Sequence, residues 1–134
     1  MTVTASKVIA IKSSADVVVV RQAVRAISEE LGFGLVDQTK IVTAASELAR
    51  NVVDYAGAGT ARLETINDGR RRGLRVVFED QGPGIANVDE ALRDGFSTGG
   101  GLGLGLGGAR RLSSEFDIAS RPGEGTRVSI TRWR

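Results

Sequence analysis

The sequence contains neither cysteine nor histidine. The missing cysteine excludes disulfide bonds and thiolate metal sites, and the missing histidine removes the commonest zinc ligand and the commonest general base. Aromatic residues are few as well, with four Phe, one Tyr and one Trp, and the formal net charge is only +2. Because such a chain offers little for nucleic-acid bases to stack on, we expect no nucleic-acid partner. Any acid–base chemistry must come from carboxylates.

Long apolar segments are also missing. No run approaches the roughly 20 residues that cross a bilayer, and the N-terminus lacks the charged and apolar regions of a secretory signal. We therefore expect a cytoplasmic protein with no membrane partner. The 134 residues suffice for one hydrophobic core but not for two, so we expect a single domain over residues 1–134.

The apolar residues follow a pattern typical of an α/β protein. The expected elements are, in chain order, a strand at 7–12, a helix that ends at Gly32, a helix from about Asp37 (a plausible N-cap) to about Ala56, strands at 60–66 and 74–80 joined by a hairpin, a short helix at 88–96, a helix over 109–116 and strands at 116–121 and 126–133. This order predicts a two-layer α/β sandwich, in which one mixed, mostly antiparallel sheet carries helices on one face.

The second helix combines an apolar stripe with a polar face. The stripe consists of Ile41, Ala45, Leu48, Val52 and Tyr55. Glu47, Asn51 and Asp54 are spaced by four and three residues, so they share a face that we expect opposite the stripe. Such a face is ordinary for a solvated helix. It also holds what phosphoryl transfer without histidine requires: an Asn oxygen for Mg²⁺, and one turn away a carboxylate that can accept a proton.

The run "GGGLGLGLGG", residues 99–108, is rich in glycine, with seven of its ten residues. Ordering so many glycines costs backbone entropy, so a loop without a task would use fewer. The amides of such a loop and of the following helix N-terminus suit an anion such as a phosphate chain. A Walker loop is excluded because no Lys follows the glycines, and a dinucleotide fold is disfavoured because no strand precedes them.

The stretch "EDQGPGI", residues 79–85, follows the apolar run of an expected strand. Glycine and proline at these positions predict a turn, and an Asp at its head can bond its own backbone. This explanation accounts for Asp80 from the local sequence alone. A role in ligand binding requires support from the rest of the chain.

Four motifs together resemble a known superfamily. They are "SELARN" on a helix (46–51), "EDQGPGI" after a strand (79–85), "GGGLGLGLGG" before a helix (99–108) and "GEGT" in the final hairpin (123–126). Their order and elements are similar to the N, G1, G2 and G3 boxes of the GHKL ATP-binding superfamily, whose fold gyrase and sensor histidine kinases share. The resemblance implies that the chain binds ATP and Mg²⁺.

The resemblance also implies roles at the adenine end of the nucleotide. Asp80 would accept a hydrogen bond from the adenine amino group. Gly82 and Gly84 would let the backbone approach the base, and Thr126 would support the adenine side.

At the phosphate end, the resemblance implies that Asn51 holds a Mg²⁺ ion that bridges the phosphates. Gly101, Gly103 and Gly105 would line the phosphates. Glu47 would be the general base.

Within the superfamily, nearly the whole chain resembles the RsbT-type switch-protein serine kinases of bacterial stress-response modules. "ELGFG", "VDQ", "SELARN", "YAG", "EDQGPGI", "DGFST" and "ARRL" occur in the family's order. The resemblance implies an enzyme that uses ATP to phosphorylate a Ser or Thr of a STAS-domain antagonist protein in a stressosome or sigma-factor pathway. After this reaction the kinase would be free to activate a PP2C-type phosphatase.

One departure keeps an alternative open. No Lys or Arg lies between Arg93 and Arg110, whereas related anti-sigma kinases can place a cation on the γ-phosphate from this segment. Arg110 and Arg111 are more simply explained as helix surface. The alternative function is therefore a non-catalytic, nucleotide-gated binding module that sequesters a protein partner, as an anti-sigma factor does. A histidine-kinase fragment is disfavoured, because the chain has no phosphoacceptor His.

Overall fold

The computed structural model describes residues 1–93 and 105–134. Five strands form one sheet in the order β1-β2-β3-β5-β4. The strands are β1 (Thr2–Ile11), β2 (Gly59–Asn67), β3 (Arg72–Asp80), β4 (Glu115–Arg121) and β5 (Gly125–Trp133). Every neighbouring pair is antiparallel. The sheet that we expected to be mixed is therefore antiparallel throughout the described residues.

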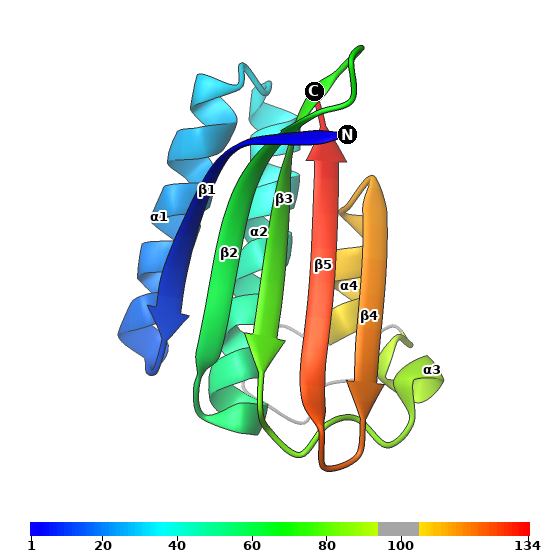
Figure 1. The fold of residues 1–134 in the computed structure, drawn as a ribbon. Coiled ribbons are helices and arrows are strands. Elements are labelled where there is room, and N and C mark those ends of the chain that lie inside the picture. Colours follow the sequence, from blue (N-terminus) through cyan, green and yellow to red (C-terminus); the bar gives the residue numbers. More distant parts are fainter. Residues whose placement is uncertain (94–104) are drawn as a thin grey trace.

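The helices form a second layer on one face of this sheet, as Figure 1 shows. They are α1 (Ser14–Glu30), α2 (Leu35–Asn51), the π-helical turn η1 (Val52–Ala56), α3 (Val88–Ala91) and α4 (Gly105–Arg111). The two-layer α/β sandwich is thus confirmed. None of the described helices combines the length and the apolar character that crossing a bilayer requires.

The core lies between the two layers. Inward-facing residues of the central strands, among them Val76 of β3 and Ile130 of β5, pack against Val20 of α1 and against Ile41 and Leu48 of α2, and each of these side chains is at most 2% exposed. Alternation along the strands and three- and four-residue spacing along the helices place them there, as the sequence pattern predicted. This core holds the C-terminal ends of α2 and β3 beside each other.

Helix α2 differs from the expectation at both ends. It begins at Leu35 with Gly34 as N-cap, so Asp37 is not the cap; it accepts hydrogen bonds from Arg132 Nε (3.1 Å) and Nη2 (2.6 Å). Beyond Asn51 the chain widens into the π-helical turn η1. Because a π-helix has more residues per turn, Tyr55 leaves the apolar stripe and is 45% exposed.

Two further boundaries differ from the expectation. Strand β1 extends from Thr2 rather than from residue 7, and its first half escaped the pattern because exposed edge residues need not alternate in polarity. Helix α4 begins earlier and ends at Arg111, while β4 starts at Glu115. The predicted helix over 109–116 was therefore wrong beyond Arg111, since Ser114 N–H already donates to Thr131 O (2.8 Å).

The β2–β3 hairpin, which the sequence predicted between these two strands, is closed by Asp68. Its Oδ1 accepts the backbone N–H groups of Arg71 (2.7 Å) and Arg70 (2.9 Å). These hydrogen bonds to the charged carboxylate lower the pKa of Asp68 from 3.8 to about 2. Because the folded pKa is depressed, the turn is stabilised above the ordinary pKa of Asp, and this contribution is lost as the pH falls towards 2.

Candidate functional site

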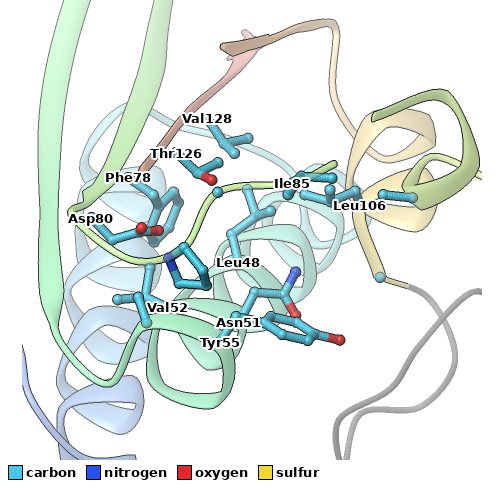
Figure 2. A pocket seen from close by; sticks show the side chains of 15 residues that line it. Leu48, Asn51, Val52, Tyr55, Phe78, Asp80, Ile85, Leu106, Thr126 and Val128 are labelled. Atoms are coloured by element: carbon cyan, nitrogen blue, oxygen red, sulfur yellow. The ribbon is translucent and has the colours of Figure 1, made fainter. Parts of the chain in front are cut away.

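A cavity of about 230 Å³ opens at the end of the sheet where β3 terminates, between the helix layer and β5. A single water occupies about 30 Å³ in the liquid, so this space is large enough for a ligand. Figure 2 shows the side chains that surround it. Its apolar lining includes Leu48, Val52, Phe78, Ile85, Leu106 and Val128, and the predicted residues on its wall are Asn51, Asp80, Gly84, Gly105 and Thr126.

Asp80 and Thr126 are direct partners across the β3–β5 ladder. Both line the cavity. The carboxylate Oδ1 of Asp80 accepts the backbone N–H of Gly82 (2.9 Å), so the turn explanation of "EDQGPGI" is confirmed. Its other oxygen, Oδ2, accepts no hydrogen bond from the described part of the chain. Asp80 thus shapes the turn with one oxygen, and its second oxygen is not used by the described residues.

Glycine is required in this turn because neighbouring chain segments pack closely on it. A Cβ on Gly82 would lie 2.6 Å from Ala56 Cβ, and a Cβ on Gly84, whose φ is +75°, would overlap the carbonyl oxygen of Arg121. Both positions therefore need glycine for the fold itself. The predicted role of Gly82 and Gly84 in letting a base approach stays a prediction.

Replacing Gly84 by Ala is expected to destabilise the protein by about 2 kcal/mol or more, because left-handed strain and a backbone clash act together. Gly123→Ala is the matched control, since Gly123 has φ +79° but no atom within 4 Å of a built Cβ. Urea denaturation of both variants gives the difference. Equal losses of unfolding free energy would contradict the packing argument.

Asn51 and Glu47 lie on α2 beside the cavity, but they differ in exposure. Asn51 is half-buried and lines the cavity together with Leu48. Glu47 is 7% exposed and lies one turn earlier, without lining the cavity. The expected position of this face opposite the apolar stripe was wrong, because both residues border the buried side of the helix; only Asp54 is exposed.

The carboxylate of Glu47 makes no hydrogen bond or ion pair with residues 1–93 or 105–134. The residue as a whole is 7% exposed, but its carboxylate oxygens are not among the fully buried atoms without a partner, of which the described residues have one, Arg50 Nε. Glu47 and Asn51 are four residues apart on the helix, which brings their Cβ atoms to about 6 Å. The arrangement can therefore place a proton acceptor within one helical turn of a neutral oxygen ligand.

Of the three glycines expected to line phosphates, the structure describes one. Gly105 is the first residue of α4 and lines the cavity. Gly101 and Gly103 lie outside the described residues. The backbone at the start of α4 thus borders the same cavity as Asn51.

The arginines near the end of α4 lie away from this cavity. Arg110 and Arg111 are exposed in the last turn of the helix, about 8 Å along its axis from Gly105. Their interpretation as helix surface is supported by this distance. Another arginine, Arg50, directly precedes Asn51 in α2. Its Nε is buried, and the described residues provide no hydrogen-bond acceptor for it.

Several cavity residues escaped the sequence analysis. Phe78 and Val128 were assigned only to strands, and Ile85 and Leu106 only to a turn and a glycine run. Ser120 was also missed: it does not line the cavity, but its hydroxyl contacts Thr126 Oγ1 (2.7 Å). A polar residue at an alternating strand position carries no signal that a loop folds over it, so the sequence alone could not reveal this contact.

Comparison with known proteins agrees with this geometry. Residues 36–133 match the family described as histidine kinase-, DNA gyrase B-, and HSP90-like ATPases. The chain is also similar to the serine/threonine-protein kinase RsbT of Bacillus subtilis (strain 168), with 50% identity over 118 residues that cover 88% of this chain and 89% of that protein.

Solved structures share the fold at lower identity. The RsbU and RsbW domains of Rv1364c from Mycobacterium tuberculosis match with a TM-score of 0.68 and 23% identity over 98% of this chain, which spans 33% of that longer chain. The SiaB-SiaC complex from Pseudomonas aeruginosa matches with a TM-score of 0.57 and 13% identity, over 98% of this chain and 91% of the other. The chain therefore belongs to the histidine kinase-, DNA gyrase B- and HSP90-like ATPases, and within them to the family of the serine/threonine-protein kinase RsbT.

Proposed function

We propose that the protein is an ATP-dependent protein serine/threonine kinase of the partner-switching type. The observation that carries the proposal is the 50% identity to the kinase RsbT over nearly the full length of both chains. The cavity supports it, because Asp80, Thr126 and Asn51, which the family motifs assign to ATP, surround one space of suitable size. ATP is the phosphoryl donor in this reaction.

The cavity suits the adenine base in shape and polarity. Apolar side chains, among them Val52 and Phe78, can contact the faces of a flat ring and bury it. The free Oδ2 of Asp80 is an acceptor for the adenine amino group. The base would thus bind at the inner end of the cavity, with its amino edge towards β3 and β5.

Mg²⁺ fits the site as an ion that arrives with the nucleotide. The described residues contain no cluster of three acidic side chains that could hold a metal alone, and Mg²⁺ commonly binds through one or two protein oxygens together with substrate phosphates and waters. The neutral side-chain oxygen of Asn51 on the cavity wall is such a ligand. When bound, the ion would neutralise charge on the phosphates.

The proposed transfer step needs a proton acceptor. The hydroxyl oxygen of a partner Ser or Thr attacks the γ-phosphorus, the bond to the β–γ bridging oxygen breaks, and ADP leaves with that electron pair. Glu47 takes the hydroxyl proton, because its carboxylate makes no hydrogen bond or ion pair with the described residues and so can accept one. Gly105 at the start of α4 lines the same cavity, and backbone amides there would stabilise charge on the phosphates.

The proposed substrate is a STAS-domain antagonist protein, and the proposed second partner is a PP2C-type phosphatase that the released kinase activates. Both follow from the resemblance to RsbT-type kinases. The alternative is a nucleotide-gated binding module without turnover. It is favoured by one observation, the absence of Lys and Arg between Arg93 and Arg110.

Phosphate transfer tests the two functions against each other. The purified protein is incubated with Mg²⁺, γ-labelled ATP and lysate of its source, and labelled proteins are examined for phosphoserine and phosphothreonine. We expect one small labelled protein. ATP binding without any labelled protein would instead support the binding module, and absence of ATP binding would overturn both functions.

Replacing Asn51 by Ala is expected to remove the effect of Mg²⁺ on nucleotide binding. In the wild type Mg²⁺ should strengthen ATP binding, and the variant should lose about tenfold in affinity with Mg²⁺ but little in EDTA. Titration calorimetry under both conditions measures this. Asn67→Ala is the control, because Asn67 lies in the β2–β3 hairpin, where its Oδ1 accepts Gly69 N–H. An unchanged Mg²⁺ effect in Asn51→Ala would reject the assignment.

A further inference from the structure

Ser120 of β4 connects three parts of the nucleotide pocket without lining it. It is the direct partner of Thr126 on β5, which in turn is the direct partner of Asp80 on β3. The three residues thus form one row across three strands, on the face that carries the cavity. Ser120 lies behind Thr126 in this row, on the side away from Asp80.

The hydroxyl of Ser120 has three hydrogen-bond contacts. Its Oγ accepts the backbone N–H of Ile85 (2.8 Å), donates to the carbonyl oxygen of Gly125 (3.1 Å) and lies 2.7 Å from Thr126 Oγ1. Ile85 belongs to the turn that follows Asp80, and Gly125 precedes Thr126. One side chain therefore joins the two segments that flank the adenine end of the pocket.

Counting hydrogens assigns a direction to the third contact. A serine hydroxyl has one hydrogen to donate and two lone pairs to accept with. If the hydrogen goes to Gly125 O and one lone pair receives Ile85 N–H, only a lone pair remains for Thr126. Satisfying all three contacts then requires that Thr126 donate its hydroxyl hydrogen to Ser120.

We propose that Ser120 is a positioning residue that fixes Thr126 as a hydrogen-bond acceptor towards the pocket, and so makes the pocket select a base that bears an amino group. With its hydrogen held by Ser120, Thr126 presents only lone pairs to a ligand. Asp80 presents an acceptor from the neighbouring strand. The Cβ atoms of directly paired residues are about 5 Å apart, and an amino group has two hydrogens, one for each of these acceptors.

The selection acts against a base with a keto oxygen at the same place. Such an oxygen has no hydrogen to donate, so neither acceptor receives a hydrogen bond from it in a largely apolar cavity. The inference rests on the proposed function, because it assumes that the cavity binds ATP through its adenine edge. It goes further because it assigns the selection between an amino and a keto base to Ser120, a residue that does not itself line the cavity.

The test compares ATP with inosine triphosphate, which carries a keto oxygen in place of the adenine amino group. Dissociation constants of both nucleotides are measured by calorimetry for the wild type and for Ser120→Ala. The wild type should prefer ATP strongly, and Ser120→Ala should reduce the ratio of the two constants by about tenfold, since the freed Thr126 hydroxyl can turn and donate to the keto oxygen. Ser120→Thr keeps a hydroxyl and should keep the ratio.

Two more variants separate the positioning of Thr126 from a nonspecific loss of folding or of nucleotide binding. Ser113→Ala is the matched control, because Ser113, which follows α4, donates its Oγ–H to Ala109 O (2.7 Å) and does not line the cavity; its ratio of dissociation constants should equal that of the wild type. Thr126→Val, which does not depend on the folding of Ser120 variants, should weaken ATP but leave inosine triphosphate unchanged.

The outcomes separate a failure of the Ser120 inference from a failure of the proposed ATP binding. If Ser120→Ala weakens both nucleotides equally, or Thr126→Val weakens inosine triphosphate as much as ATP, Ser120 has only a structural role and the inference is overturned. If the wild type binds ATP and inosine triphosphate equally well, the inference is also overturned while ATP binding stands. If the wild type binds neither, the proposed function fails and the inference falls with it.

Discussion

Asp80→Asn is expected to weaken ATP binding by about 100-fold or more. Both carboxylate oxygens of Asp80 must accept: Oδ1 accepts Gly82 N–H at 2.9 Å, and Oδ2 is assigned to the adenine amino group. An asparagine amide has only one accepting oxygen and carries a donor in place of the other. Either the turn loses its acceptor, or an NH₂ group confronts the NH₂ group of adenine.

Calorimetric titration with ATP measures the loss, and thermal unfolding shows whether the variant still folds. Asp117→Asn is the matched control, because Asp117 is exposed on β4 and should bind ATP as the wild type does. An Asp80→Asn variant that folds and binds ATP with unchanged affinity would reject the adenine assignment. Asp80 would then serve the turn alone.

Glu47→Gln is expected to slow phosphate transfer by about 10²-fold or more, because glutamine keeps the shape of the side chain but cannot take a proton. ATP affinity should change little, since Glu47 does not line the cavity. Glutamine is preferred to alanine here because Glu47 is 7% exposed, and truncation would leave a void in the packed helix layer. The measurement is single-turnover transfer of labelled γ-phosphate to the acceptor protein.

The control for this prediction is Glu29→Gln, because Glu29 is exposed on α1 and should transfer phosphate at the wild-type rate. If Glu47→Gln transfers phosphate at the wild-type rate, Glu47 is not the base. If it loses ATP binding together with transfer, Glu47 acts on the nucleotide and not on the proton. Loss of transfer with retained binding is the only combination that supports the assignment.

The site was accessible to sequence reasoning where chemistry is concentrated in short motifs. Asp80, Gly84, Asn51, Gly105 and Thr126 come from four separate motifs, and the structure brings them to one cavity. Each motif constrains its own backbone strongly: a turn head, a left-handed glycine, a helix end or a hairpin. Such constraints depend only on residues adjacent in sequence, so they can be recognised without knowing the fold.

Predictions that depended on helix geometry succeeded only in part. The apolar stripe of α2 was correct up to Val52, but the π-helical turn η1 moved Tyr55 out of it. The same reasoning put Glu47 on a solvated face, although α1 and α4 both pack against α2 and Glu47 is 7% exposed. An ideal helical wheel contains neither the widened turn nor the neighbouring helix, so it could not predict either result.

The sequence by itself determined the α/β class, the strand and helix order and the four motifs, because periodicity and turn chemistry are local properties of the chain. Only the tertiary structure decided that the sheet is antiparallel in the order β1-β2-β3-β5-β4, that Glu47 is buried and that Ser120 stands behind Thr126. Each of these depends on contacts between residues distant in sequence, and contacts of this kind form only when the layers pack.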